Sequence, residues 1–395
     1  MPQPALELAD IFRQHGPDYR QTHPLPLYQH RVMQAVESCR TPVLGGVVEW
    51  CDHCQYTHIH YRSCRNRHCP KCQGAASAQW LQQRTAELLP VEYFHVVFTV
   101  PEEIARIAFY NQETVYGLLF RTVSETLLTI ARDPKHLGAE IGFFAVLHTW
   151  GQNLHLHPHL HCVVPGGGLS PDGDWVACLP GFFLPVRVLS RLFRRLFLEA
   201  LRHAYADGQL HFFGDLEPLR DPAAFDRYLA PLHDKEWVVY AKPPFAGPRQ
   251  VLEYLGRYTH RIAISNQRLL ALEEGQVSFR WKDYRHPQRP KVTTLPAEEF
   301  IRQFLLHALP RGFQRIRYFG LLANCHRAEK LERCRRLLAV PFADLLPHPA
   351  NPREIDPAIT GHFPRLCPRC GVGILARVEV WPPSHGPVPL RVDTS

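Results

Sequence analysis

Residues 148–161 read HTWGQNLHLHPHLH, and this stretch holds five of the chain's 24 histidines. A neutral imidazole binds divalent metal ions near pH 7. From His159 to Val164 the residues alternate as they do on a strand, where residues two apart share one face. His159 and His161 are therefore predicted to point the same way, as two adjacent metal ligands on a rigid element.

Two strand histidines are expected to need a third metal ligand. His148 lies on the preceding predicted strand, and a hairpin through residues 151–158 would bring it beside the pair. Gln152 is the alternative, because it lies closer to the turn and offers an amide oxygen. His155 and His157 are interpreted as flanking loop residues.

The composition is that of a folded protein with a basic surface. The chain has 395 residues, of which 45% are hydrophobic and 21% charged, and a net charge of +8. This length predicts more than one domain. No apolar run approaches the ~20 residues of a membrane span, and the N-terminus does not resemble a signal peptide. Basic blocks in residues 187–202 and 311–336 favour a polyanionic partner, nucleic acid first.

Strands and helices that follow each other without strict alternation predict an α+β fold with an antiparallel sheet. Strands are expected in residues 93–100, 143–150, 159–164, 237–241, 277–281 and 291–294. Helices are expected in residues 27–37, 75–88, 102–131, 186–206, 250–261 and 297–308. Three regions are predicted. Residues 1–90 are expected to bind zinc and recognise DNA, and residues 91–340 form a larger mixed domain. Residues 341–395 are a proline-rich linker and tail.

Two C-x2-C pairs predict a zinc site. Cys51 and Cys54 are separated from Cys69 and Cys72 by a fourteen-residue spacer. Four thiolates in this arrangement form a closed, tetrahedral and therefore structural site for Zn²⁺. Such pairing in a chain with no predicted export signal favours metal over disulfides and a reducing compartment, the cytoplasm.

Further cysteines and histidines leave a second zinc site open. Its candidate ligands are Cys39, Cys64, His30 and His68, although the two cysteines would also suit a buried core. A third C-x2-C pair, Cys367 and Cys370, is half a site that Cys325 and Cys334 could complete. Close in sequence to Cys69 and Cys72, the cations Arg65, Arg67 and Lys71 suit a DNA-contacting surface.

A pair of tyrosines supplies a candidate nucleophile. Tyr254 and Tyr258 are four residues apart, so they share a face of the predicted helix, where ordinary core aromatics would be the alternative. Arg257, His260 and Arg261 add phosphate-binding donors beside Tyr258. A tyrosine hydroxyl is a weak nucleophile, and a histidine-bound Mg²⁺ or Mn²⁺ that polarises a scissile phosphate would make its attack feasible.

These motifs together resemble one family. The strings are CRT from Cys39, SCRNRHCPKC from Ser63, HTWGQ from His148, HPHLHC from His157, PGGG from Pro165 and YLGRYTHR from Tyr254. The chain is similar to rolling-circle transposases of the insertion sequence 91 family, within the HUH endonuclease superfamily. The resemblance implies a zinc-binding domain followed by a nuclease domain with a central antiparallel sheet flanked by helices.

The resemblance also implies a chemistry. Single-stranded DNA at transposon ends and in the target would be nicked and rejoined through a 5′-phosphotyrosine. By position, His159 and His161 match the metal-binding pair, and Tyr254 and Tyr258 match the two-tyrosine helix, with Tyr258 as the expected primary nucleophile. His148 matches the spacing of the third ligand in related relaxases. A plasmid relaxase or replication initiator with the same chemistry, or a non-catalytic DNA-binding remnant, are the alternatives.

Overall fold

The computed structural model describes residues 6–72, 79–84, 87–242, 262–283, 289–339 and 365–383. The predicted helix of residues 250–261 lies outside these ranges. Within them, no helix is both long and apolar enough to cross a membrane.

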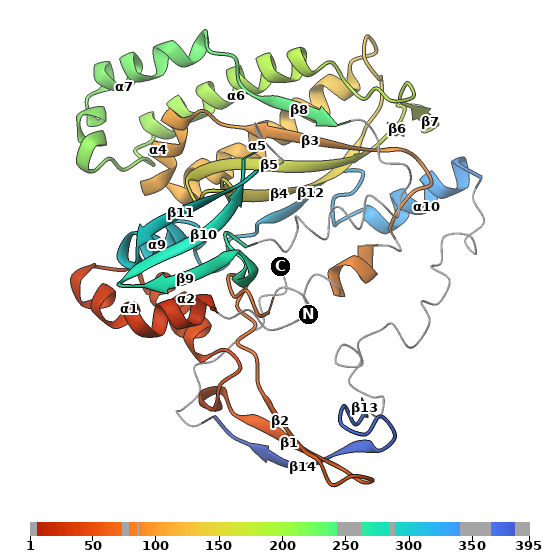
Figure 1. The fold of residues 1–395 in the computed structure, drawn as a ribbon. Helices are drawn as coiled ribbons and strands as arrows, with labels where there is room; N and C mark the ends of the chain where they lie inside the picture. Colours follow the sequence, from red (N-terminus) through yellow and green to blue (C-terminus); the bar gives the residue numbers. More distant parts are fainter. Residues whose placement is uncertain are drawn as a thin grey trace.

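The centre of the molecule is a five-stranded antiparallel sheet (Figure 1). Its order is β12 (Ile316–Gly320), β4 (Gly142–Trp150), β5 (Leu156–Pro165), β3 (Tyr93–Thr99) and β8 (Val239–Lys242). Every neighbouring pair in this sheet is antiparallel. The predicted α+β fold with a central antiparallel sheet is confirmed.

Helices cover one face of this sheet, as Figure 1 shows. They are α4 (Glu102–Tyr110), α5 (Gln112–Arg132) and α6 (Val186–Ala206). Leu160, Cys162 and Val164 of β5 are buried in the core against them. Because side chains alternate along a strand, the intervening residues, His159 and His161, lie on the opposite face. Burial of the apolar residues of β5 thus determines the direction in which its histidines point.

A second layer packs near the opposite face and anchors the β4–β5 hairpin. It contains a three-stranded sheet of β9 (Leu269–Glu273), β10 (Gln276–Lys282) and β11 (Pro290–Pro296), followed by α9 (Ala297–Leu305). These elements share a core with α1 (Leu8–Thr22) and α2 (Leu27–Ser38). Trp150 and Leu154 of the hairpin are buried in that same core, so the loop between the predicted metal ligands is held in place.

A third sheet combines two strands from the N-terminal region with two strands from the C-terminal region. Its order is β13 (Arg365–Leu366), β14 (Ile374–Trp381), β1 (Gly46–Cys51) and β2 (Thr57–Tyr61). The assignment of residues 341–395 to a linker and tail is therefore wrong for residues 365–383. Strand β14 pairs antiparallel with β1 over the whole length of β1, a long-range pairing that local composition does not reveal. The structure also contains β6 (Gly167–Leu169), β7 (Trp175–Ala177), α7 (Pro222–Leu229) and α10 (Arg327–Leu337).

A buried histidine ties the hairpin to the second layer. The Nε2–H of His307 donates to the Leu154 carbonyl at 2.8 Å, and its Nδ1 lies 3.1 Å from the Thr149 hydroxyl. Burial lowers the pKa of His307 from 6.5 to about 4, with a smaller contribution from His155. The folded protein therefore favours the neutral ring.

We expect this histidine to make the fold acid-sensitive. Because the pKa is lowered in the folded state, its contribution to stability is present above pH 6.5 and is lost as the pH falls towards 4. The full difference is about 3 kcal/mol. Urea unfolding of the wild type and of His307→Gln at pH 7.5 and 5 measures it. The gap between the two proteins should narrow at pH 5, and an unchanged gap would contradict the assignment.

Candidate functional site

Three histidines converge on the face of the central sheet opposite α5 and α6. His148 of β4 and His159 of β5 are directly paired across the two strands, and His161 follows two residues later. One ring nitrogen of each lies within 4.8 Å of the others. The ring centroid of His148 is 5.5 Å from that of His159 and 4.4 Å from that of His161. The predicted pair and its predicted third partner are therefore brought together.

Hydrogen bonds orient two of these rings. His159 Nδ1 donates to the His157 carbonyl at 2.6 Å, and His161 Nδ1 lies 2.8 Å from Nε2 of His95. Metal-binding imidazoles generally have such a partner on the second ring nitrogen, which fixes the tautomer. Both contacts make Nε2 the nitrogen that would coordinate an ion. The three imidazoles fit a divalent metal ion, for which two or three histidine ligands are common.

His95 is a site residue that sequence analysis missed. It is 2% exposed, and its ring stacks on that of His161 with centroids 5.0 Å apart. Strand β3 pairs with β5 so that Val97 lies opposite His161. The signal was therefore present: a histidine on a predicted strand, two residues from the position that faces His161. The position of His95 beside His161 follows only from the pairing of β3 with β5, which local periodicity does not reveal.

The histidines open into a cleft of about 1600 Å³. Its walls carry aromatic side chains from three parts of the chain, including Tyr110, Phe213 and Tyr240. Phe213 is 50% exposed and Tyr240 51% exposed, so aromatic surface is open to solvent in the same cleft as the histidines. Cations also line it, and they face carboxylates: Lys291 lies 2.7 Å from Asp283.

Gln152, His155 and His157 line the same cleft. The backbone carbonyl of Gln152 accepts a hydrogen bond from Arg268, so the turn that carries it is held to the second layer. Its side-chain amide stays the alternative third ligand. His155 is exposed and contacts Asn153 within the loop, and His157 is exposed.

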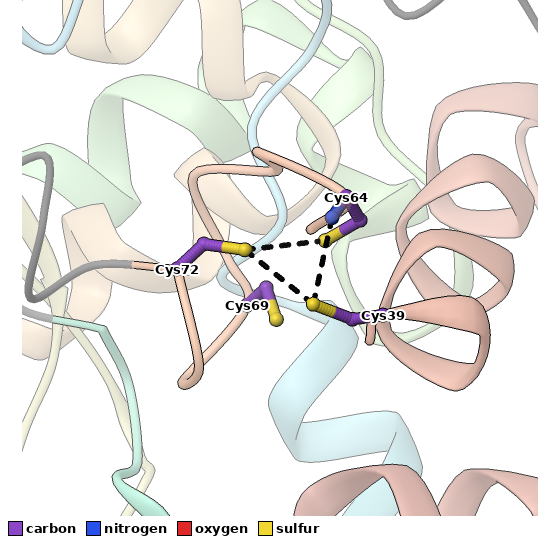
Figure 2. A group of neighbouring side chains, drawn as sticks. All are labelled: Cys39, Cys64, Cys69 and Cys72. Atoms are coloured by element: carbon purple, nitrogen blue, oxygen red, sulfur yellow. Dashed lines mark hydrogen bonds between the residues drawn. The ribbon is translucent and has the colours of Figure 1, made fainter. Parts of the chain in front are cut away.

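Four cysteines form a first thiolate cluster, shown in Figure 2: Cys39, Cys64, Cys69 and Cys72. Cys39 follows α2, and the other three lie in the loop after β2. The sulfur of Cys72 lies 3.5 Å from that of Cys39 and 3.6 Å from that of Cys64. A tetrahedral zinc ion with bonds of about 2.3 Å holds its sulfurs about 3.8 Å apart, and a disulfide brings them to about 2.05 Å. The spacing fits zinc and excludes disulfides.

A second cluster contains Cys51, Cys54, Cys367 and Cys370. The Cys51 and Cys370 sulfurs are 3.8 Å apart, and those of Cys54 and Cys367 are 3.6 Å apart. Backbone amides point at the sulfurs, as the Gly373 N–H does at Cys370 at 3.3 Å. Amides of Gly373 and Val372 lower the pKa of Cys370 to about 6. This set also fits a closed zinc site.

The predicted single site of Cys51, Cys54, Cys69 and Cys72 is therefore wrong, because each pair belongs to a different cluster. Cys51 ends β1, beside β14, and that pairing delivers Cys367 and Cys370 to it. The suggested second site is corrected in part. Cys39 and Cys64 are in a cluster, but its other members are cysteines in place of His30 and His68.

The remaining alternatives have other roles. His68 is buried, and its Nε2 accepts the Leu309 N–H at 3.3 Å. Burial holds the pKa of His68 well below 6.5, consistent with an acceptor in the core. Cys334 is buried in a small apolar cluster with Leu331, and Cys325 is exposed.

Two of the three predicted DNA-contacting residues close to Cys69 and Cys72 interact with other parts of the protein. Arg67 donates to the carbonyls of Phe313 at 2.6 Å and Pro310 at 2.8 Å. Lys71 pairs with Glu7 at 2.5 Å. These two residues fasten the cysteine loop to the rest of the protein, and Arg65 is exposed. The predicted tyrosine helix, with Tyr254, Arg257, Tyr258, His260 and Arg261, lies outside the described residues.

Known families match both halves of this arrangement. A family model described as a transposase zinc-binding domain matches residues 11–100, and one described as a putative transposase matches residues 142–330. The chain is 61% identical over 393 residues to putative transposase y4qJ of Sinorhizobium fredii, covering 98% of each chain. It is 29% identical over 290 residues to the transposase for insertion sequence element IS801 of Pseudomonas savastanoi pv. phaseolicola, covering 73% of this chain and 68% of that one.

Among solved structures, the conjugative relaxase TrwC in complex with oriT DNA is similar over 63% of this chain and 71% of that chain, at 14% identity and a TM-score of 0.24. A likeness of that size carries no argument about the site. The putative transposase y4qJ is a far stronger match, because it covers 98% of this chain. The chain belongs to the insertion sequence 91 family of transposases.

Proposed function

We propose that this transposase nicks and rejoins single-stranded DNA at transposon ends through a 5′-phosphotyrosine intermediate. The observation that carries the proposal is the convergence of His148, His159 and His161 in the lining of a large cleft that also carries aromatic side chains. Three imidazoles on two neighbouring strands form a rigid set of potential metal ligands, and the cleft that they line has a volume of about 1600 Å³.

The chemistry assigns a role to each group. A bound Mg²⁺ or Mn²⁺ ion would polarise the scissile phosphate and stabilise the charge that develops on it. The Tyr258 hydroxyl loses its proton and forms a bond to phosphorus, while the bond from phosphorus to the 3′ oxygen breaks and that oxygen takes a proton. Arg257, His260 and Arg261 would bind neighbouring phosphates. Tyr254 would serve the second cleavage.

The walls of the cleft suit an unpaired strand. Bases without a complementary strand stack on aromatic side chains, and this recognition tolerates any sequence. Tyr110 and Phe213 lie with ring centroids 5.4 Å apart in the wall. The domains serve the same end: residues 1–90, with the C-terminal strands added to them, would recognise DNA, and residues 91–340 would cut it.

A covalent-adduct assay tests this proposal. We expect the full-length protein and a single-stranded oligonucleotide from a transposon end to give a protein–DNA adduct with Mg²⁺ or Mn²⁺ and none with EDTA. Loss of one ligand in His159→Ala should reduce the rate about 100-fold or more, since metal stabilisation supplies several kcal/mol. Denaturing gel electrophoresis measures the adduct.

His155→Ala is the matched control, because His155 lines the same cleft but is an exposed loop residue. It should retain near-normal adduct formation. If the wild type binds the oligonucleotide but forms no adduct with either ion, the chain is a non-catalytic DNA-binding protein and the proposal fails.

A further inference from the structure

A fourth group of metal-ligating side chains lies on the hairpin of β1 and β2, in the sheet that carries the second cysteine cluster. His58 and His60 are two residues apart on β2 and share a face, and Glu49 of β1 lies directly opposite His58. One ligand atom of each residue lies within 4.8 Å of the others. The arrangement repeats that of the cleft: a His-x-His strand with a third ligand on its neighbour.

The distances within this group suit an ion better than hydrogen bonding alone. His60 Nε2 lies 3.0 Å from Glu49 Oε2, but His58 Nδ1 lies 3.8 Å from the same oxygen, beyond hydrogen-bond reach. His58 Nδ1 is shielded from solvent and has no hydrogen-bond partner among the described residues. Metal–ligand bonds of about 2.0–2.2 Å span nitrogen–oxygen separations of roughly 3–4 Å.

Burial of the three side chains is intermediate. The Glu49 side chain is 14% exposed, and those of His58 and His60 are 28% and 35% exposed. The carboxylate is therefore largely withdrawn from water, which favours a cationic partner, while the imidazoles border solvent. An ion could reach the site without opening the sheet, and water could complete its coordination.

We propose that Glu49, His58 and His60 bind a divalent transition-metal ion, with zinc as the ion that fits best. Two imidazoles and one carboxylate suit Zn²⁺ and its first-row neighbours, whereas Mg²⁺ and Ca²⁺ prefer oxygen ligands throughout. The site shares no ligand with the two cysteine clusters or with the histidine cleft. Its role is structural, because the ion bridges β1 to β2, the edge strand of its sheet.

Zinc titration of a cleft variant tests the site without interference from the catalytic histidines. Full-length His159→Ala, with its cysteine clusters loaded, is titrated with Zn²⁺ by isothermal calorimetry. We expect one further equivalent to bind. The same titration of His159→Ala/His60→Ala and of His159→Ala/Glu49→Gln should show that equivalent lost, with the zinc of the cysteine clusters retained as evidence of an intact fold.

His159→Ala/His30→Ala is the matched control, since His30 lies in the same N-terminal region outside all of these clusters. It should still bind the added equivalent. The site is overturned if His159→Ala binds no further zinc, or if the Glu49 and His60 variants bind it unchanged. Because the readout is zinc stoichiometry, a failed DNA-cleavage assay would leave this result standing.

Discussion

Replacing Tyr258 by phenylalanine should abolish the covalent adduct with transposon-end DNA. The substitution removes one oxygen, and that oxygen is the proposed nucleophile, so loss on the order of 10⁴-fold or more is expected. Binding of the oligonucleotide should persist, because the ring and the neighbouring Arg257 and Arg261 are unchanged. Adduct yield on a denaturing gel and DNA affinity by fluorescence anisotropy are measured on the same preparation.

Two further variants make this test specific. Tyr254→Phe should retain the first cleavage, since Tyr254 is assigned to the second. Tyr240→Phe changes an exposed tyrosine in the cleft wall and should cleave normally. Adduct formation by a variant lacking both Tyr254 and Tyr258 hydroxyls would refute the tyrosine mechanism. If adduct formation were lost in Tyr254→Phe and retained in Tyr258→Phe, Tyr254 would be the nucleophile of the first cleavage and Tyr258 that of the second.

The central sheet and the convergence of His159 and His161 on one face could be predicted because their signals are local. Along β5, apolar residues at 160, 162 and 164 alternate with the histidines, so burial of one set sets the direction of the other. The helix over Val186–Ala206 was likewise predictable from its own periodicity, which places Leu189, Phe193 and Phe197 in the core.

The features that escaped prediction depend on distant strands. Cys51 and Cys54 have the spacing of a zinc half-site, but spacing alone cannot tell which other pair completes it. The answer comes from β14, more than three hundred residues further along the chain, which pairs with β1. His95 was missed for the same reason, since only the pairing of β3 with β5 brings it to His161.

Replacing Cys367 by serine should release one zinc ion and detach the C-terminal strands from the N-terminal sheet. The second cluster has two ligands from each end of the chain, so loss of one thiolate opens the site and removes a cross-link between β1 and the segment after β13. Structural zinc and folding are coupled in such small modules. The zinc bound by cysteines should fall from about two equivalents to about one.

Limited proteolysis distinguishes this outcome from general unfolding. Residues 365–383 should become cleavable in Cys367→Ser, while the central sheet keeps its far-ultraviolet circular dichroism signal. Cys325→Ser is the control, because Cys325 is exposed and outside both cysteine clusters, and it should keep both cysteine-bound zinc ions. A single zinc site built from Cys51, Cys54, Cys69 and Cys72 makes the opposite prediction, since Cys367→Ser would then leave the zinc content unchanged. The same substitution therefore decides between local spacing and strand pairing as the source of the ligand set.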